Sequence, residues 1–109
     1  MGGRHIIYEI RTYQLASGGL TESPDVAKTM ILPSVAEYGL KPSAFSHTEV
    51  GQLNEVVHLW AYKDLNQRQE KWTRWAKDPR SVELAKRLRG VILSETKKIL
   101  FPTEFSAMQ

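Results

Sequence analysis

Residues 51–65 read GQLNEVVHLWAYKDL, and this stretch decides the fold. Residues 51–54 have the composition of a hairpin turn, and residues 55–62 are the strongest strand candidate of the chain. Side chains alternate across a strand. One face of this strand therefore carries His58, Trp60 and Tyr62, and the other carries Val57, Leu59 and Ala61. We expect helices to cover the purely apolar face and a different partner to cover the aromatic face.

Three further segments have the pattern of strands. The first spans residues 5–15 and alternates in the same way. The second spans residues 43–50, and the last lies within residues 91–101, mainly in the letters SETKKIL. Poor alternation and the neighbouring Lys97 and Lys98 suit this last strand to the edge of a sheet.

Helix signals fill the two gaps between these strands. Ser23-Pro24-Asp25 combines an N-cap, a proline at the first helical position and an acidic first turn. Pro33 should kink or break this helix, and Gly39 should end it. By the same signals the second gap holds two helices, one from Asp64 to about Lys77 and one from Asp78-Pro79 to Gly90.

The resulting order, β-α-β-β-α-α-β, is typical of an α+β ferredoxin-like fold with a split second helix. Such a chain forms a four-stranded antiparallel sheet with helices on one face. We expect a single domain over residues 1–109, with a core of about residues 5–101 and a tail at residues 102–109. A second copy is the simplest cover for the remaining sheet face, which predicts a homodimeric α/β barrel.

Composition excludes several kinds of protein. The chain has 109 residues, a formal net charge of +3 and no cysteine, which excludes disulfides and cysteine-based zinc sites. The basic excess lies in residues 63–98 without a nucleic-acid-binding motif, so we expect no nucleic-acid partner. No signal peptide is recognisable, and no apolar run approaches the roughly 18 residues of a transmembrane span. We expect a cytoplasmic protein.

Polar and aromatic residues of two strands are the candidate ligand-binding site. On the first strand Glu9, Arg11 and Tyr13 share one face. We expect the second subunit to bury the Glu9–Arg11 ion pair, which either fixes strand register and dimer geometry or forms the polar floor of a ligand site. The complete candidate set is Glu9, Arg11, Tyr13, His58, Trp60 and Tyr62.

His58 is the one candidate for catalysis. A histidine among aromatic rings can act as a general base or be a hydrogen-bonded residue of the barrel interior. The spacing of the three histidines suggests no metal ligands, and we expect no metal and no cofactor. Trp72 and Trp75 have the spacing of a helix face that packs on the sheet, although such a pair can also line a cleft.

Several segments resemble the NIPSNAP family over about residues 6–106. They are YEIRTY at residues 8–13, GQLNEVVHLWAY at residues 51–62, Trp75, Asp78-Pro79 and FPTEFS at residues 101–106. The resemblance implies a ferredoxin-like dimeric α/β barrel. Eukaryotic members are linked to mitochondria, vesicle traffic and autophagy, and no agreed catalytic residues exist to carry over. Two places depart from the family pattern. One is the segment of residues 21–24, and the other is Arg80-Ser81, where the family pattern has an aromatic residue.

Three hypotheses about function remain after these steps, and the third, haem binding, needs an axial histidine for which only His58 and His47 are available. The first is a binding or interaction module that takes a protein partner or a small apolar ligand. The second is a cofactor-independent monooxygenase-like or isomerase-like enzyme acting on a small aromatic compound, which is an analogy of fold. The enzyme hypothesis predicts an enclosed cavity of roughly 300 Å³ or more that reaches His58 or Trp60. The binding-module hypothesis predicts that these side chains are packed without a cavity beside them.

Overall fold

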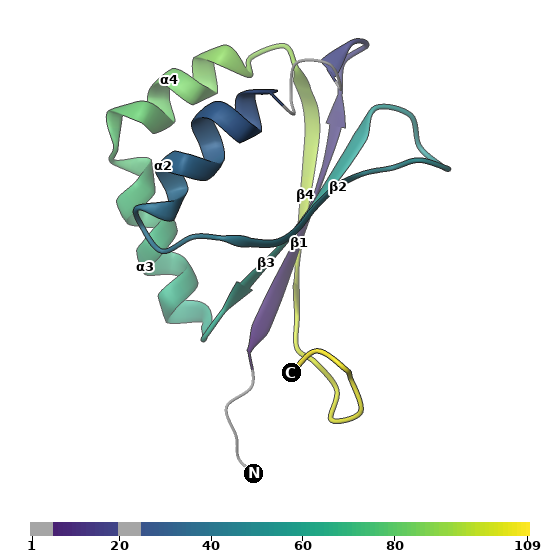
Figure 1. Ribbon diagram of the computed structural model, residues 1–109, viewed down its shortest axis with the longest axis vertical. Coiled ribbons are helices and arrows are strands. Elements are labelled where there is room, and N and C mark those ends of the chain that lie inside the picture. The colour runs from purple at the N-terminus through teal and green to yellow at the C-terminus, as the bar shows by residue number, and fades with distance from the viewer. Residues whose placement is uncertain (1–5, 20–24) are drawn as a thin grey trace.

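Alternating residues build one antiparallel sheet, which carries the whole architecture (Figure 1). The computed structural model describes residues 6–19 and 25–109. Within them the elements are β1 (Ile7–Leu15), the π-helix η1 (Ala27–Ile31), α2 (Leu32–Ala36), β2 (Pro42–His47), β3 (Glu55–Tyr62), α3 (Leu65–Ala76), α4 (Pro79–Arg87) and β4 (Ile92–Leu100). The order confirms the predicted α+β ferredoxin-like fold.

The strands lie in the order β2-β3-β1-β4, and all neighbours are antiparallel. In β1 and β3, Glu9 lies opposite Trp60 and Arg11 lies opposite His58. The last strand is an edge strand, as the lysines of its sequence predicted. Because β1 is parallel to β2 and β3 is parallel to β4, both helical connections are crossovers, whose usual right-handedness brings the helices to one face.

The helices cover the face opposite to the one predicted. Figure 1 shows α2, α3 and α4 on one side of the sheet, and the core beneath them contains Trp60 and Tyr62, each 2% exposed. Large rings bury more apolar area than small side chains do, so this face gains most from a helical cover. The expectation that helices lie over the Val57, Leu59 and Ala61 face is therefore wrong.

Some boundaries also differ from those predicted. The second strand ends at His47 rather than residue 50, so the hairpin loop is longer than the four residues expected. Pro33 does not break its helical region, because the chain passes from the π-helix into α2 and Pro33 lies in the first turn of α2. His5, where the first strand was predicted to begin, and Ser23-Pro24, where the first helix was predicted to begin, lie outside the described residues.

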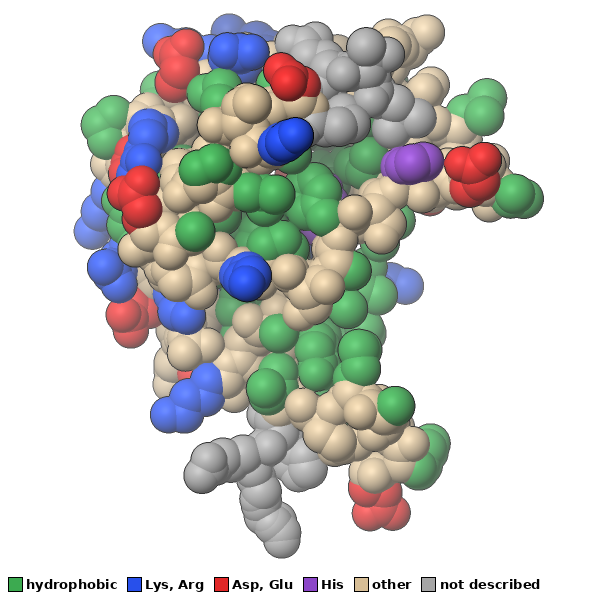
Figure 2. Space-filling model, in the orientation of Figure 1, with side chains coloured by type: hydrophobic (Ala, Val, Ile, Leu, Met, Phe, Trp, Pro, Cys, Tyr) green, Lys and Arg blue, Asp and Glu red, His purple; other side chains and the backbone are tan. Residues whose placement is uncertain are grey.

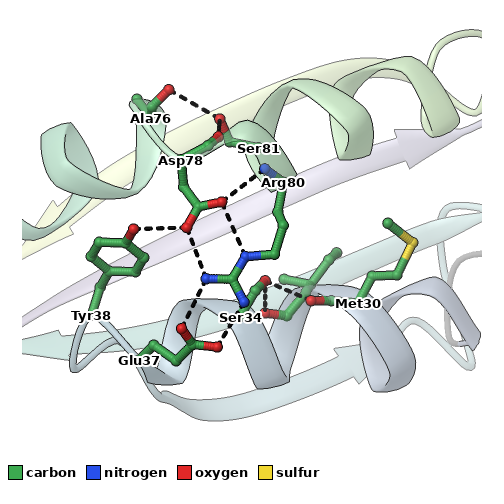
Figure 3. A network of polar contacts seen from close by, with 9 residues as sticks. Met30, Ser34, Glu37, Tyr38, Ala76, Asp78, Arg80 and Ser81 are labelled. Carbon is green, nitrogen blue, oxygen red and sulfur yellow. Dashed lines mark hydrogen bonds and ion pairs between the residues drawn. The ribbon is translucent and has the colours of Figure 1, made fainter.

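The two aspartate caps are confirmed. Asp64 accepts a hydrogen bond from the backbone N–H of Gln67, and Asp78 accepts one from that of Arg80. Figure 3 shows that the Arg80 guanidinium also binds Asp78 and Glu37, while the Tyr38 hydroxyl donates to Asp78. Arg80, one of the departures from the family pattern, thus ties the end of α2 to the start of α4.

Glycines end the first and last helical regions as predicted. Gly39 and Gly90 adopt φ of 76° and 83°, the left-handed conformation that favours glycine after a helix. None of the helices formed by the described residues has the length and apolar character to cross a membrane.

Candidate functional site

A cavity of about 160 Å³ lies between the sheet and the helices. We call it the interlayer cavity. Its sheet side consists of Arg11, Tyr13, Leu15, Phe45, Val56, His58, Trp60 and Ile92, and its helix side consists of Ile31, Val35, Trp72, Trp75, Leu84 and Leu88. Figure 2 shows hydrophobic side chains gathered where the surface is hollowed between the helices and the β2–β3 hairpin. The interior is therefore apolar except for a few polar groups of the sheet.

Glu9 is the centre of a buried polar cluster beside the cavity. Its side chain is fully buried, with Oε1 3.2 Å from Arg11 Nη2 and Oε2 2.8 Å from Arg68 Nη2. The Tyr62 hydroxyl donates to Oε1 at 2.6 Å and accepts a hydrogen bond from Trp72 Nε1 at 2.7 Å. The register of β1 on β3 and one turn of α3 bring these five groups together.

The ionisation of this cluster follows from its contacts. Burial alone would raise the pKa of Glu9, but hydrogen bonds from Arg68 and Tyr62 and the charge of Arg11 together hold that pKa below its ordinary value. Burial and the neighbouring Glu9 carboxylate raise the pKa of Tyr62, so this phenol stays neutral. One carboxylate therefore faces two guanidinium groups, which leaves the cluster with one excess positive charge.

Arg11 is held on aromatic surface as well as by its ion pair. Its Cζ lies 4.1 Å from the ring centroid of Trp72 and 5.9 Å from that of Trp60. A guanidinium stacked on an indole gains cation–π attraction and has little freedom to turn. The side chain is only 10% exposed, so its charge lies at the cavity wall rather than in water.

His58 is fixed between two rings. Its centroid lies 3.5 Å from that of Phe45 in a stacked arrangement and 4.9 Å from that of Tyr13. Burial, reinforced by the charge of Arg11, lowers the pKa of His58 to about 4. The imidazole is consequently neutral at pH 7 and is a hydrogen-bonding group, not a cation.

Three buried polar atoms of residues that line the cavity have no hydrogen-bond partner among residues 6–19 and 25–109. They are Arg11 Nε, His58 Nε2 and Trp60 Nε1, and each belongs to a residue at most 8% exposed. Buried donors without partners are uncommon in folded proteins and call for an explanation. Here all three belong to residues that line one cavity.

The sequence grouped these side chains on one sheet face, and the structure confirms this. Four of the six candidates, Arg11, Tyr13, His58 and Trp60, line the interlayer cavity, while Glu9 and Tyr62 lie in the adjoining cluster. The expectation that a second subunit buries the Glu9–Arg11 pair is wrong, because α3 covers it with Arg68. The cavity reaches both His58 and Trp60 but has about half the volume expected for an enzyme.

Sequence reasoning did not include two residues of the site. Arg68 lies one helical turn before Trp72, and that spacing could have indicated a shared face toward the sheet. Phe45 carries no comparable signal, because its contact with His58 depends on the β2–β3 register. Within the part of the chain that the structure describes, no group of three or more His, Cys, Asp or Glu side chains could hold a metal ion.

Comparison with known proteins places this chain in a family. The NIPSNAP family model matches residues 8–107. The chain belongs to the NIPSNAP family. It is 29% identical over 103 residues to "Protein NipSnap homolog 3A" of Homo sapiens, and 27% identical to "Protein NipSnap homolog 3B" of the same organism. These alignments cover 94% of this chain but 42% of each human protein, so the chain spans less than half of their length.

Solved NIPSNAP structures agree with this assignment. A NIPSNAP family protein with unknown function from Agrobacterium tumefaciens is 30% identical, with a TM-score of 0.91 over 99% of this chain and 97% of that protein. A NIPSNAP-like domain protein from Burkholderia xenovorans is 28% identical, with a TM-score of 0.88 over 95% of this chain and 90% of that one. A putative antibiotic biosynthesis monooxygenase from Nitrosomonas europaea, 9% identical with a TM-score of 0.66, shares the fold alone.

Proposed function

We propose that this NIPSNAP protein is a binding module whose interlayer cavity takes one small, mostly apolar ligand. The observation that carries the proposal is the composition of the cavity wall, which is apolar apart from the side chains of Arg11, Tyr13 and His58 and the indoles of its tryptophans. A small-molecule site in proteins has this composition, with an apolar lining and a few polar groups that orient the ligand.

Cavity volume supports a ligand with a single ring. An apolar cavity of about 150 Å³ in another protein holds benzene. The interlayer cavity has about 160 Å³, and rings of Trp72, Trp75 and Phe45 surround it. A compound with one ring would fill this volume, so we expect a compact ligand.

Turnover is the second candidate, and the neutral His58 favours it. His58 lines the cavity with a neutral imidazole, which is the form that can accept a proton. However, a base with a pKa of about 4 holds a proton poorly at pH 7, and general bases work best with a pKa near the working pH. Ligand binding therefore ranks above catalysis.

We also propose that two copies pair through the sheet face that the helices leave bare. We call it the bare face; its centre consists of Ile10, Val57, Leu59 and Ala61. These side chains form a continuous apolar strip across two central strands, and such strips favour association. Two-fold pairing of identical faces is the commonest form of homo-oligomer.

A cavity-filling substitution tests the ligand proposal. Leu84 lines the cavity from α4, and Leu84→Trp should fill much of the space a ring would occupy. We expect toluene and benzyl alcohol to shift the indole N–H signals of the unmodified protein in NMR titrations, and these shifts to disappear in the variant. Val82→Trp, on the exposed side of the same helix, is the matched control and should bind like the unmodified protein.

Two results would contradict the proposal. One is an unmodified protein that binds neither compound at millimolar concentration. The other is equal binding by Leu84→Trp and by the unmodified protein, which would place the ligand outside the interlayer cavity. Circular dichroism spectra of both variants confirm that each is folded before binding is compared.

A further inference from the structure

Phe45 stands where the interlayer cavity meets solvent. Its side chain lines the cavity and is 36% exposed, while every other described residue of the lining is buried or less exposed. In Figure 2 the hollow opens between the helices and the β2–β3 hairpin, and β2 is the strand that carries Phe45. A side chain with one side toward the cavity and another toward water lies on the route between them.

Polar contacts tie together the helices and strands at other borders of the cavity. Arg80 joins the start of α4 to Glu37 at the end of α2, with 2.6 Å between Nη1 and Oε2. Glu9 of β1 pairs with Arg68 of α3 at 2.8 Å. Among the described residues, no hydrogen bond or ion pair joins residues 42–47 of β2 to a helix. The border between β2 and the helices is therefore held by packing and by the chain connection alone.

A single stacking contact holds the Phe45 ring against the wall. Its centroid lies 3.5 Å from that of His58, with 19° between the ring planes. Carbon atoms at this separation are already in van der Waals contact, so no ligand ring passes between the two. His58 is buried and Phe45 is partly exposed, so Phe45 is the ring that can turn away into solvent. Stacking of this kind is weak, and partly exposed side chains change rotamer rapidly.

The strand that carries Phe45 is suited to such movement. β2 lies at the edge of the sheet and pairs with β3 alone. Its register on β3 shifts between Pro42 and Ala44, directly before Phe45. Irregularities of this kind re-aim side chains and are frequent at sheet edges and beside binding sites. Phe45 can therefore move without breaking the pairing of the two central strands.

We infer that Phe45 is the gate of the interlayer cavity. The inference rests on the proposed binding function and adds how the ligand enters. With the gate closed, the Phe45 ring lies on His58 as in this structure; with the gate open, the ring has turned outward and a single-ring compound passes. Binding that waits for such a change has a lower association rate constant than binding to an open site.

Phe45→Ala removes the gate and tests the inference. Relaxation-dispersion NMR of the indole N–H signals, recorded at several concentrations of benzyl alcohol, gives the association and dissociation rate constants separately. We expect the association rate constant to rise about threefold to tenfold, the factor that one aromatic stacking contact corresponds to. A residue that only forms part of the wall would change mainly the dissociation rate constant, because ligand contacts act mostly on dissociation.

Val56→Ala is the matched control. Val56 lines the same cavity from β3 but is only 7% exposed, so the substitution enlarges the cavity without touching its mouth. We expect this variant to release benzyl alcohol faster and to bind it with an unchanged association rate constant. Phe45→Leu keeps an apolar side chain but has no flat ring to stack, and it should also associate faster if Phe45→Ala does not fold.

The outcomes distinguish the gate from the proposed function. If benzyl alcohol binds and its association rate constant is the same in the unmodified protein and in the Phe45 variants, Phe45 is not a gate, while the proposed function stands. An equal rise in Val56→Ala would likewise overturn the inference, since any loss of wall volume would then speed entry. If benzyl alcohol binds to none of these proteins, the gate and the proposed function are both wrong.

Discussion

Glu9 is the residue on which the buried cluster depends. It joins β1 to α3 by pairing with Arg11 and Arg68, and it accepts a hydrogen bond from Tyr62. We expect Glu9→Gln to lower the free energy of unfolding by about 3 kcal/mol, because removing one partner leaves buried charges uncompensated. Urea denaturation measures this loss. Glu70→Gln, on the exposed side of α3, should change it by less than about 0.5 kcal/mol, and equal losses would rule out a structural role for Glu9.

His58 should make stability depend on pH. Its pKa is about 4 in the folded chain, because of burial and then the charge of Arg11, against about 6.5 when unfolded. The unfolded chain therefore binds more protons between these values, so stability present above pH 6.5 is lost as the pH falls toward 4. Between pH 7.5 and pH 5, we expect His58 to account for about 2 kcal/mol of the loss.

Urea unfolding of His58→Gln at the same two pH values checks this contribution. The variant lacks the titrating ring, so its stability should fall less than that of the unmodified protein over this interval. His47→Gln makes the same change at an exposed histidine and is the matched control. If the free energy of unfolding of His58→Gln fell as much as that of the unmodified protein, the loss of stability would come from other groups.

At the level of elements, period and capping signals predicted most of the fold. Two-residue alternation located β1 and β3, and the aspartates before α3 and α4 located both helix starts. The end of β2 was predicted wrongly because Thr48, Glu49 and Val50 continue the alternating sequence pattern. Of these three residues, only Thr48 still donates a backbone hydrogen bond to β3, at Glu55. Local patterns describe each segment but not where its pairing stops.

The assignment of the sheet faces could not be predicted from alternation alone. Both faces of β3 carry apolar residues, and a period of two separates the faces without saying which lies under the helices. The crossover direction and the fit of Trp72 and Trp75 against Trp60 decide that, and both involve contacts between distant segments. By contrast, the candidate site residues of each strand could be grouped correctly, because alternate residues of a strand share a face and this needs only local information.

The N-cap of α3 gives a prediction at this scale. Asp64 accepts a hydrogen bond from Gln67 N at 2.7 Å, and α3 carries Arg68 and Trp72 to the site. We expect Asp64→Ala to lower the free energy of unfolding by about 1 kcal/mol. Asp64→Asn keeps a capping side chain, so its loss should be at most about half of that in Asp64→Ala. Thermal or urea unfolding measures both, and equal losses would contradict the capping role.

Across the whole molecule, the two sheet faces differ in what covers them. Helices close the face that carries Trp60, while the bare face, with Ile10 and Leu59 near its centre, has no helix over it in the described structure. We expect sedimentation equilibrium at micromolar concentration to give twice the 12.4 kDa of one chain. Leu59→Asp should produce single chains, because a charge would be buried at the centre of the pairing.

Val82→Asp is the control for this result. It introduces the same charge on the exposed side of α4, away from the sheet, and should leave the assembly paired. A single-chain mass for the unmodified protein, or a paired mass for Leu59→Asp, would contradict association through the bare face.

The ligand cavity is tested most directly by a crystal structure of the protein soaked in bromobenzene, whose bromine is located by anomalous scattering. We predict one bromine peak per chain between the sheet and the helices, within contact distance of Trp60 and Trp72. Crystals whose bromine peaks all lie on the molecular surface, with no peak in the interlayer cavity, would contradict it.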